Sequence, residues 1–491
     1  MSTTLSQDIN FPIVLRVVGW LLMIESQFML LPMGVAWYYG ENQVALVFLV
    51  TLLATLGAGA AMAYGIKPST RSMRKREGLL LTSLVWIFFS IFGMIPLLAT
   101  DSVPSVTDAF FETMAGFTTT GSSVVIPENL SHGVLLWRSL MQWIGGLGII
   151  LFTLAVLPML NYKGGIALFN AEVTGITHER MRPRVNQTAK SLWAIYLVLT
   201  IVLGFMLYPA MGGFDATCHA LSTISTGGFS TKSNGLIFWR SYYVAYVVMA
   251  FMFLGGINFS LIYFTVLGKF KRLWRSSIFK WYVCIIFIAA TLIFIRALHQ
   301  GYSDDFSEPA LFAIFDTVSA ITSTGYITAS YEPTGEFISM VLMVLMFFGG
   351  MAGSTSGGAK LDRFVVLFKN CKNELYKVLH PNSVIAVWID GKAMPQARIN
   401  KVTAFLAIYV LIIVVVAIVL TAFNIPLFDA LFSSMSAISN VGLGYGVTGV
   451  DGSWATLPDA VKWILSFEML VGRLELFTVL VVFSRSFWVK D

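Results

Sequence analysis

The chain has 491 residues, of which 57% are hydrophobic and only 12% are charged. Ordinary soluble domains carry about 25% charged residues, so the composition excludes a soluble protein of this size. The net charge of +6 would suit nucleic-acid binding, but the basic residues recur at the intervals of membrane spans. We therefore expect membrane lipid around the protein and no nucleic-acid partner.

Ten apolar runs follow one another, each near the roughly 20 residues that cross a bilayer as a helix. They lie at about 12–37, 44–66, 78–100, 135–159, 191–211, 240–267, 281–299, 337–359, 402–423 and 460–483. The first begins at Phe11 without a basic lead or cleavage site, so it is interpreted as a retained span and not as a signal peptide. The sequence predicts an all-α integral membrane protein with ten transmembrane helices.

Lys and Arg gather in every second connection, whereas the intervening connections hold almost none. The basic connections are 67–76, 163–190, 269–280 and 360–401, and Arg485 and Lys490 follow the last run. Such an excess marks the cytoplasmic side of a membrane protein. We expect both termini and these four connections in the cytoplasm.

Four outward connections are too apolar for exposed loops, and each ends in a polar cluster with glycine. The segments DAFFETMAGFTTTGSS, DATCHALSTISTGGFS, FAIFDTVSAITSTGYI and DALFSSMSAISNVGLG begin at 108, 215, 312 and 429. Aligned without gaps, they place a glycine at 121, 228, 325 and 442, at one fixed offset. Turns that merely fill space are the alternative, but four glycines in register between spans favour a repeated pore element.

Each segment has room for a half-helix of about three turns followed by a strand that ends in glycine. Asp108, Asp215 and Asp429 stand where an N-cap is expected, because a side-chain oxygen there accepts from free backbone N–H groups. The third copy has Phe312 at this place, and Ser307 before Pro309 could start its helix earlier. Half-helices that enter the membrane point their negative ends at its centre and favour a cation there.

The predicted architecture is four units of span, pore helix, re-entrant strand and span around a central pore. Two extra spans occupy 1–67, and the units occupy 78–160, 190–268, 280–368 and 400–485. Non-helical backbone at membrane depth must line a cavity or be buried in protein, and glycine lets successive carbonyls face one axis and replace an ion's water. The expected ion ligands are Thr119, Thr120, Gly121, Thr226, Gly227, Gly228, Ser323, Thr324, Gly325, Asn440, Val441 and Gly442.

A second glycine cluster interrupts the second span of the third unit, at Gly349, Gly350, Gly353, Gly357 and Gly358. A helix would lose about 1 kcal/mol per glycine, so we expect a break there and a flexible loop that gates the pore. Close helix packing through small residues is the alternative. For the pairs at 145–146 and 255–256, packing alone is the favoured interpretation.

Arg473 lies near the centre of the last span, where a charge costs at least about 2.5 kcal/mol. A structural ion pair with Glu468 or Glu475 is one interpretation. On one continuous helix, however, both glutamates lie far around from the arginine. We therefore expect Arg473 to face the pore and to act in gating.

The four strands, the segment GGMAGSTSGGAK at Gly349–Lys360 and the segment GRLELFT at Gly472–Thr478 resemble those of the Trk-type potassium uptake proteins of bacteria. The likeness covers almost the whole chain and points to the TrkH branch of the Trk/Ktr/HKT superfamily. It implies potassium uptake across the bacterial inner membrane, potassium as the bound ion, and a homodimer with one pathway per subunit. It also implies a cytoplasmic TrkA-like nucleotide-binding ring, for which the connection 360–401 would be either a docking surface or only a topology signal.

Two other functions remain to be distinguished. A proton- or sodium-coupled cation symporter would use the same scaffold and an acidic relay at membrane depth, for which Glu112 and Asp316 are the candidates. A membrane-embedded enzyme would need a clustered catalytic constellation. The sequence contains no phosphate loop, dinucleotide fingerprint or catalytic triad spacing, so we expect no enzyme activity.

Overall fold

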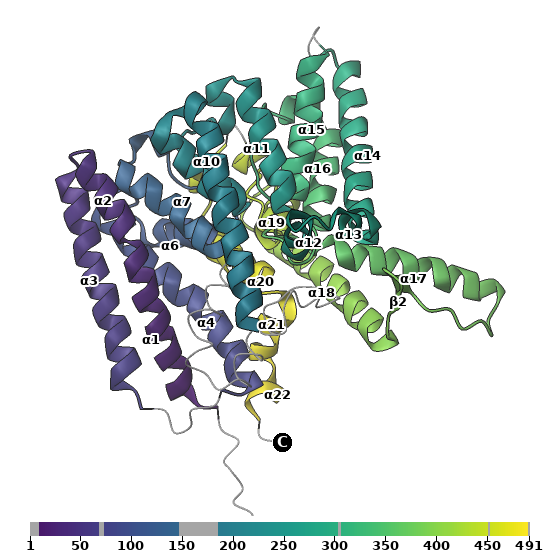
Figure 1. The fold of residues 1–491 in the computed structure, drawn as a ribbon, viewed down its shortest axis with the longest axis horizontal. Helices are drawn as coiled ribbons and strands as arrows, with labels where there is room; N and C mark the ends of the chain where they lie inside the picture. Colours follow the sequence, from purple (N-terminus) through teal and green to yellow (C-terminus); the bar gives the residue numbers. More distant parts are fainter. Residues whose placement is uncertain (1–8, 68–72, 147–184, 303–305, 450–451, 490–491) are drawn as a thin grey trace, which may run out of the picture.

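The computed structural model describes residues 9–67, 73–146, 185–302, 306–449 and 452–489, which are predominantly helical (Figure 1). The C-terminal part of the predicted span 135–159, the end of the unit 78–160 and most of the basic connection 163–190 lie outside the described residues. Within them, six helices are long and apolar enough to cross a membrane, or seven if a bent pair counts as one span.

The helices are grouped in chain order under the extra pair and the four units that the sequence predicts. The extra pair comprises α1 (Phe11–Phe28), α2 (Leu30–Tyr38) and α3 (Asn42–Gly65). The first unit holds α4 (Lys75–Gly93), α5 (Ile95–Ala99), α6 (Val106–Phe117) and α7 (His132–Gly146); the second holds α10 (Val185–Ile224), α11 (Tyr242–Gly255) and α12 (Phe259–Val266). The third holds α14 (Ser277–His299), α15 (Ser307–Ile321) and α16 (Glu336–Phe348); the fourth holds α18 (Gln396–Thr421), α19 (Leu427–Ile438), α20 (Asp459–Arg473) and α21 (Leu476–Leu480).

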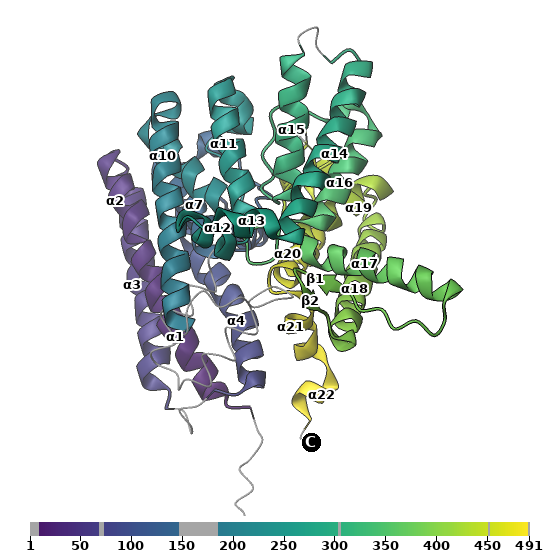
Figure 2. The ribbon, with the colours of Figure 1, turned by 45° about the vertical axis from the view of Figure 1, so that its right-hand side comes forward.

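Short elements join the units. Helix α13 (Phe270–Arg275) links the second to the third, and α22 (Arg485–Trp488) closes the described chain. Helix α17 (Leu361–Leu379) and the antiparallel strands β1 (Trp388–Ile389) and β2 (Lys392–Ala393) link the third unit to the fourth. In both views α17 projects away from the helical bundle (Figures 1 and 2).

Several predicted spans are broken, which explains why fewer than ten long helices are found. Gly212, with φ of 77°, divides α10 into a first span and a half-helix. Helices α11 and α12 meet at an angle of 106°, α16 ends at Phe348, and α20 ends at Arg473. Three of the four second spans are thus interrupted, and glycine lies next to each break.

The units close into a ring because each second span packs against the next unit. The contacts are α7 with α10, α11 with α15, α16 with α19, and α20 with α6. Large apolar side chains remain exposed on the outward helices, among them Leu46 on α3, Phe205 on α10, Phe287 on α14 and Ile418 on α18. Such an apolar outer surface is what a bilayer would cover, since lipid is the only solvent that favours it.

The extra pair packs on the first unit, where α1 contacts α4 and α2 contacts α7. At the turn before α3, Glu41 accepts hydrogen bonds from the backbone N–H groups of His132 and Gly133 at 2.9 and 3.2 Å. This carboxylate satisfies two of the free N–H groups at the start of α7. The two ends of the described chain also meet, because the ring of Phe11 stacks on that of Trp488.

Candidate functional site

The four predicted strands share one backbone conformation. The first residue of each lies in the left-handed region with φ of 52–56°, and the last, a glycine, has φ of 79–83°. The first residues are Thr119, Thr226, Ser323 and Asn440, and the glycines are Gly121, Gly228, Gly325 and Gly442. Left-handed φ is uncommon outside glycine, so its recurrence at four equivalent places shows that the sequence repeat is also a backbone repeat.

The strands interlock in a closed ring. A Cβ atom placed on any of the four last glycines would lie only 1.9–2.3 Å from a carbonyl oxygen of the next strand. The pairs of glycine and facing carbonyl are Gly121 with Gly227, Gly228 with Thr324, Gly325 with Val441, and Gly442 with Thr120. The contacts run from the first unit to the second, third, fourth and back to the first. Glycine is therefore required at these four places by close approach as well as by φ.

Hydrogen bonds between buried side chains stabilise the ring. Thr120 shares a hydrogen bond of 2.8 Å with Thr118, and Thr324 shares one of 2.9 Å with Thr322. Asn440 crosses between units and donates to the hydroxyl oxygen of Thr120 at 3.0 Å. The fourth and first strands are therefore joined by a side chain as well as by packing.

The ring offers an ion only oxygen ligands. Within the described ranges, no group of three or more His, Cys, Asp or Glu side chains is placed to hold a metal ion. In contrast, the hydroxyl oxygen of Thr119 and the side-chain carbonyl oxygen of Asn440 are buried and have no hydrogen-bond partner among the described residues. Oxygen is the ligand that hard cations take, so the ring suits an alkali cation better than a transition metal.

The predicted N-caps of the pore helices are wrong. Helix α6 is capped by Ser105, whose hydroxyl accepts from the N–H of Asp108 at 3.4 Å. Helix α19 follows Pro426, which places Asp429 in its first turn and not at its cap. In the third unit, α15 begins at Ser307, as expected. The carboxylates still lie in the first turn of each pore helix, near the positive end of its dipole. They stand three residues after the N-cap position.

Instead, the three aspartates hold the outer ends of the pore helices to later segments. Each carboxylate reaches a polar group well beyond its own helix. Asp108 pairs with Lys462 of the fourth unit at 2.5 Å, Asp215 accepts from the hydroxyl of Thr231 at 2.8 Å, and Asp429 accepts from the N–H of Val447 at 3.0 Å.

One turn further, four equivalent side chains fasten each pore helix to the chain that returns outward from the ring. The contacts are Glu112 with Ser123 and Val124, His219 with Ser230, Asp316 with Thr328, and Ser433 with Thr448, at 2.9–3.4 Å. Glu112 also forms a buried ion pair of 2.8 Å with Arg138. The two residues considered for an acidic relay, Glu112 and Asp316, thus hold the strands in place.

The glycine segment of the third unit leaves the helix at the predicted place and lies against the ring. Helix α16 ends at Phe348, and residues 349–360 run without helix to the start of α17. Gly357 donates its N–H to the hydroxyl of Ser323, and Gly358 donates to the carbonyl of Ser439 at 2.8 Å. The segment therefore contacts the third and fourth strands directly.

The same segment is fixed to the broken span of the second unit. The N–H of Met351 donates to the carbonyl of Gly256 at 2.9 Å. The peptide groups of Ala352 are held on both sides: its N–H donates to the Asp362 carboxylate at 2.6 Å, and its carbonyl accepts from the Asn258 side chain at 2.6 Å. Sequence reasoning missed this clamp of Asn258 and Asp362. The available signal for Asn258 was its amide, two residues after the glycine pair at 255–256.

Arg473 lies at the junction of three units. Its guanidinium donates to the carbonyl of Gly145 in the first unit at 2.7 Å and to that of Thr355 in the glycine segment at 3.1 Å. One charged side chain thus connects the second span of the first unit, the glycine segment of the third and the end of α20.

The expectation of one continuous helix around Arg473 is wrong. Helix α20 ends at Arg473 and α21 begins at Leu476, with Glu475 between them at φ of 60°. Glu475 turns to Arg363, with which it pairs at 2.5 Å, and Glu468 accepts from the hydroxyl of Ser434 at 2.6 Å. Close to the break, Gly472 packs against the fourth pore helix, where a Cβ would lie 1.9 Å from the carbonyl oxygen of Ile438.

The glycine pairs of the first two units serve packing, as expected. A Cβ on Gly145 would lie 1.9 Å from the carbonyl oxygen of Phe117, and one on Gly256 would lie 2.5 Å from the hydroxyl oxygen of Tyr282. These contacts bring α7 close to the inner end of the first pore helix and the end of α11 close to α14.

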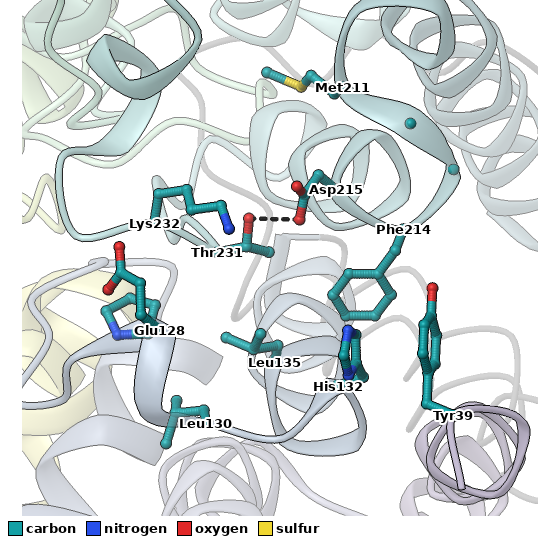
Figure 3. A pocket seen from close by; sticks show the side chains of 13 residues that line it. Tyr39, Glu128, Leu130, His132, Leu135, Met211, Phe214, Asp215, Thr231 and Lys232 are labelled. Atoms are coloured by element: carbon teal, nitrogen blue, oxygen red, sulfur yellow. Dashed lines mark hydrogen bonds between the residues drawn. The ribbon is translucent and has the colours of Figure 1, made fainter.

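An outer cavity of about 460 Å³ opens where the extra pair, the first unit and the second unit meet. Figure 3 shows the rings of Tyr39, His132 and Phe214 close together, with Asp215 and Lys232 further along the wall. The rings of Tyr39 and His132 stack at 3.8 Å. Asp215, Glu128 and His132 on its wall accept from or pair with Thr231, Ser233 and Glu41, respectively.

Comparison with known proteins identifies the family. A family model described as cation transport protein, TrkH, matches residues 44–489. The chain is 34% identical over 487 residues to the Trk system potassium uptake protein TrkH of Escherichia coli K12, covering 98% of this chain and 99% of that protein. It is also 34% identical to its counterpart in Vibrio parahaemolyticus, again covering 98% and 99%.

The chain belongs to the TrkH family. The crystal structure of the potassium transporter TrkH from Vibrio parahaemolyticus superposes on it with a TM-score of 0.88 at 32% identity, covering 98% of this chain and all of that one. This TrkH-family chain is therefore a multi-pass membrane transporter and not an enzyme, as the sequence predicted.

Proposed function

We propose that this TrkH-family chain carries potassium into the cytoplasm through the ring of four strands. The single observation that supports this most strongly is the closed ring itself, in which each glycine fits against a carbonyl of the next unit. We infer that the ion is potassium because the relatives are named as potassium uptake proteins. The twelve strand residues act as the selectivity filter, and their backbone carbonyls replace the water around the ion.

The energetics permit a passive route. A membrane potential supplies about 2.3 kcal/mol per charge per 100 mV, and a tenfold concentration gradient costs about 1.4 kcal/mol. A potential of about 100 mV would therefore hold roughly fifty-fold accumulation of potassium without a coupled ion.

In the proposed membrane arrangement, ten spans and four re-entrant loops form each subunit, with both termini in the cytoplasm of a bacterial cell. The stacking of Phe11 on Trp488 supports termini on one side. We place the basic connections, with the exposed helix α17, on that same side, because an excess of Lys and Arg marks the cytoplasmic side.

The proposed gate consists of residues 349–360 and Arg473. The segment lies against the third and fourth strands, and Arg473 joins it to the first unit. A guanidinium stays protonated at working pH, and a fixed positive charge near the path raises the barrier for a cation. In the assembly that we propose, two such subunits pair, and a TrkA-like nucleotide-binding ring docks on the connection 360–401 and controls the gate.

Reversal potentials of the purified protein in liposomes test the proposal. With opposed gradients of potassium and protons, a potassium channel follows the potassium gradient alone. A reversal potential that moves with the proton or sodium gradient would instead establish a coupled symporter. Absence of any potassium flux in a correctly folded preparation would overturn the proposed function.

A further inference from the structure

One buried amide of the first unit reaches into the strand of the second. Gln142 lies on α7, is fully buried, and donates to the carbonyl of Gly227 at 2.6 Å. Its own side-chain oxygen accepts from the N–H of Phe229 at 3.1 Å. The two hydrogen bonds bracket Gly228, and only one orientation of the amide satisfies both, since the carbonyl needs a donor and the N–H needs an acceptor.

This amide is peculiar to the first unit. Aligned on Gly145, Gly255, Gly349 and Gly472, the second spans place a residue three positions earlier at Gln142, Met252, Met346 and Met469. The register is supported by structure, because Gly145 and Gly472 face the carbonyls two residues before the first and fourth strands. All four side chains are fully buried, and a thioether donates no hydrogen bond.

The amide also explains why the second strand has two glycines. A Cβ on Gly227 would lie 2.4 Å from the side-chain carbon of the Gln142 amide, so the amide occupies the space of a side chain. Gly227 does not have positive φ, and its backbone alone would accept another residue. The equivalent places in the other strands hold Thr120, Thr324 and Val441.

The held carbonyl is part of the ring. The oxygen of Gly227 is the one against which Gly121 packs, at 2.1 Å from an added Cβ. Any movement of this carbonyl therefore changes the junction between the first and second strands. We propose that Gln142 is a positioning residue that sets the second strand, and through it ion selectivity. This inference rests on the proposed function, which makes the ring the selectivity filter.

Replacement of Gln142 by the residue of the other units tests this inference. In liposomes, Gln142→Met should lower the ratio of potassium to sodium permeability about fivefold, which is what one lost neutral hydrogen bond is worth. Met252→Leu is the matched control: it occupies the same place in the second unit, conserves volume, and should leave the ratio unchanged.

If Gln142→Met folds poorly, a second test combines it with a substitution at Gly227, the residue that the amide contacts. Gly227→Thr alone should lower the melting temperature, because the new side chain collides with the amide. Gln142→Met with Gly227→Thr should restore it, since the new hydroxyl lies two residues from Ser225, as Thr120 lies from Thr118 and Thr324 from Thr322. A double variant no more stable than Gly227→Thr would overturn the reciprocity and with it the inference.

The outcomes separate this inference from the proposed function. If the wild type carries no potassium, the proposed function fails. If the wild type is selective and Gln142→Met keeps its permeability ratio, only the inference fails. A loss of flux and melting temperature at unchanged ratio would show that Gln142 is purely structural and would equally reject the inference.

Discussion

At the scale of single residues, the space around a glycine decides whether a side chain can replace its hydrogen. Gly121 combines a φ of 83° with a neighbouring carbonyl that leaves no room for a Cβ. Gly57 on α3 would meet nothing within 4 Å. The repeat register already marks Gly121 in the sequence, and the packing of the strands shows why a side chain would be tolerated at Gly57 and not there.

Gly121→Ser should lower the ratio of potassium to sodium permeability. The added Cβ must displace the Gly227 carbonyl, and a distorted oxygen ring holds a poorly dehydrated potassium ion less well. Reversal potentials in mixed potassium and sodium gradients measure the effect. Gly57→Ser serves as the control and should match the wild type. An unchanged ratio in well-expressed Gly121→Ser would remove Gly121 from the filter.

Arg473→Ala should increase potassium flux, whereas Arg473→Lys should remain nearer the wild type if charge alone matters. The alanine variant removes the positive charge and the two hydrogen bonds to Gly145 and Thr355. Flux and thermal stability are measured on the same purified variants. Lower flux together with lower stability would mean that Arg473 only holds the three units together.

At the scale of elements, the glycine segment is held by hydrogen bonds to the second, third and fourth units. Ala352 carries two of them, to Asn258 and Asp362. Each such bond contributes about 1 kcal/mol to the position of the segment.

Asn258→Ala should raise potassium flux if the segment 349–360 closes the pore. Loss of one hydrogen bond shifts a two-state equilibrium about fivefold toward the open form. Flux assays without any partner protein measure this shift. Asn400→Ala, an exposed amide on α18, is the control. Shortening the segment should act in the same direction and more strongly. Abolished flux in a folded, shortened variant would show that the segment is packing and not a gate.

The sequence predicted the order of the elements well, because spans, basic connections and glycine registers are one-dimensional patterns. It predicted the helix break at Gly349 for the same reason. It misplaced the caps at Asp108 and Asp429 by three residues, since Ser105 and Pro426 offered competing start signals. The contacts of Gln142 and Asn258 join residues far apart along the chain, and no periodicity could reveal them.

At the scale of the whole molecule, the outer connections tie the units to one another. Glu128 of the first unit accepts hydrogen bonds from both the backbone N–H, at 2.8 Å, and the hydroxyl of Ser233 in the second. Burial alone would raise the pKa of the Glu128 carboxyl, but the bonds from Ser233 outweigh it and leave the pKa below the ordinary value of 4.5.

A carboxyl with a depressed pKa stabilises the fold above its ordinary pKa and loses that effect as the pH falls through the folded value. Glu128→Gln should therefore lower the melting temperature slightly at about pH 7, and the difference from the wild type should shrink near about pH 3. Exposure of Glu128 keeps the effect under about 1 kcal/mol. A difference that persisted unchanged in acid would exclude the ionised carboxylate as its source.

The closure of four unequal units within one chain has a consequence for how this pore can change. In a channel assembled from four identical subunits, any substitution appears four times around the axis. Here the last glycines must all be kept, because each fits against its neighbour, but a substitution behind the ring alters one quadrant alone. Gln142, the Thr120–Asn440 bond and Arg473 each occur once, and the equivalent places of the other units lack them. A covalently joined ring can therefore diversify selectivity and gating one quarter at a time, which a symmetric tetramer cannot do.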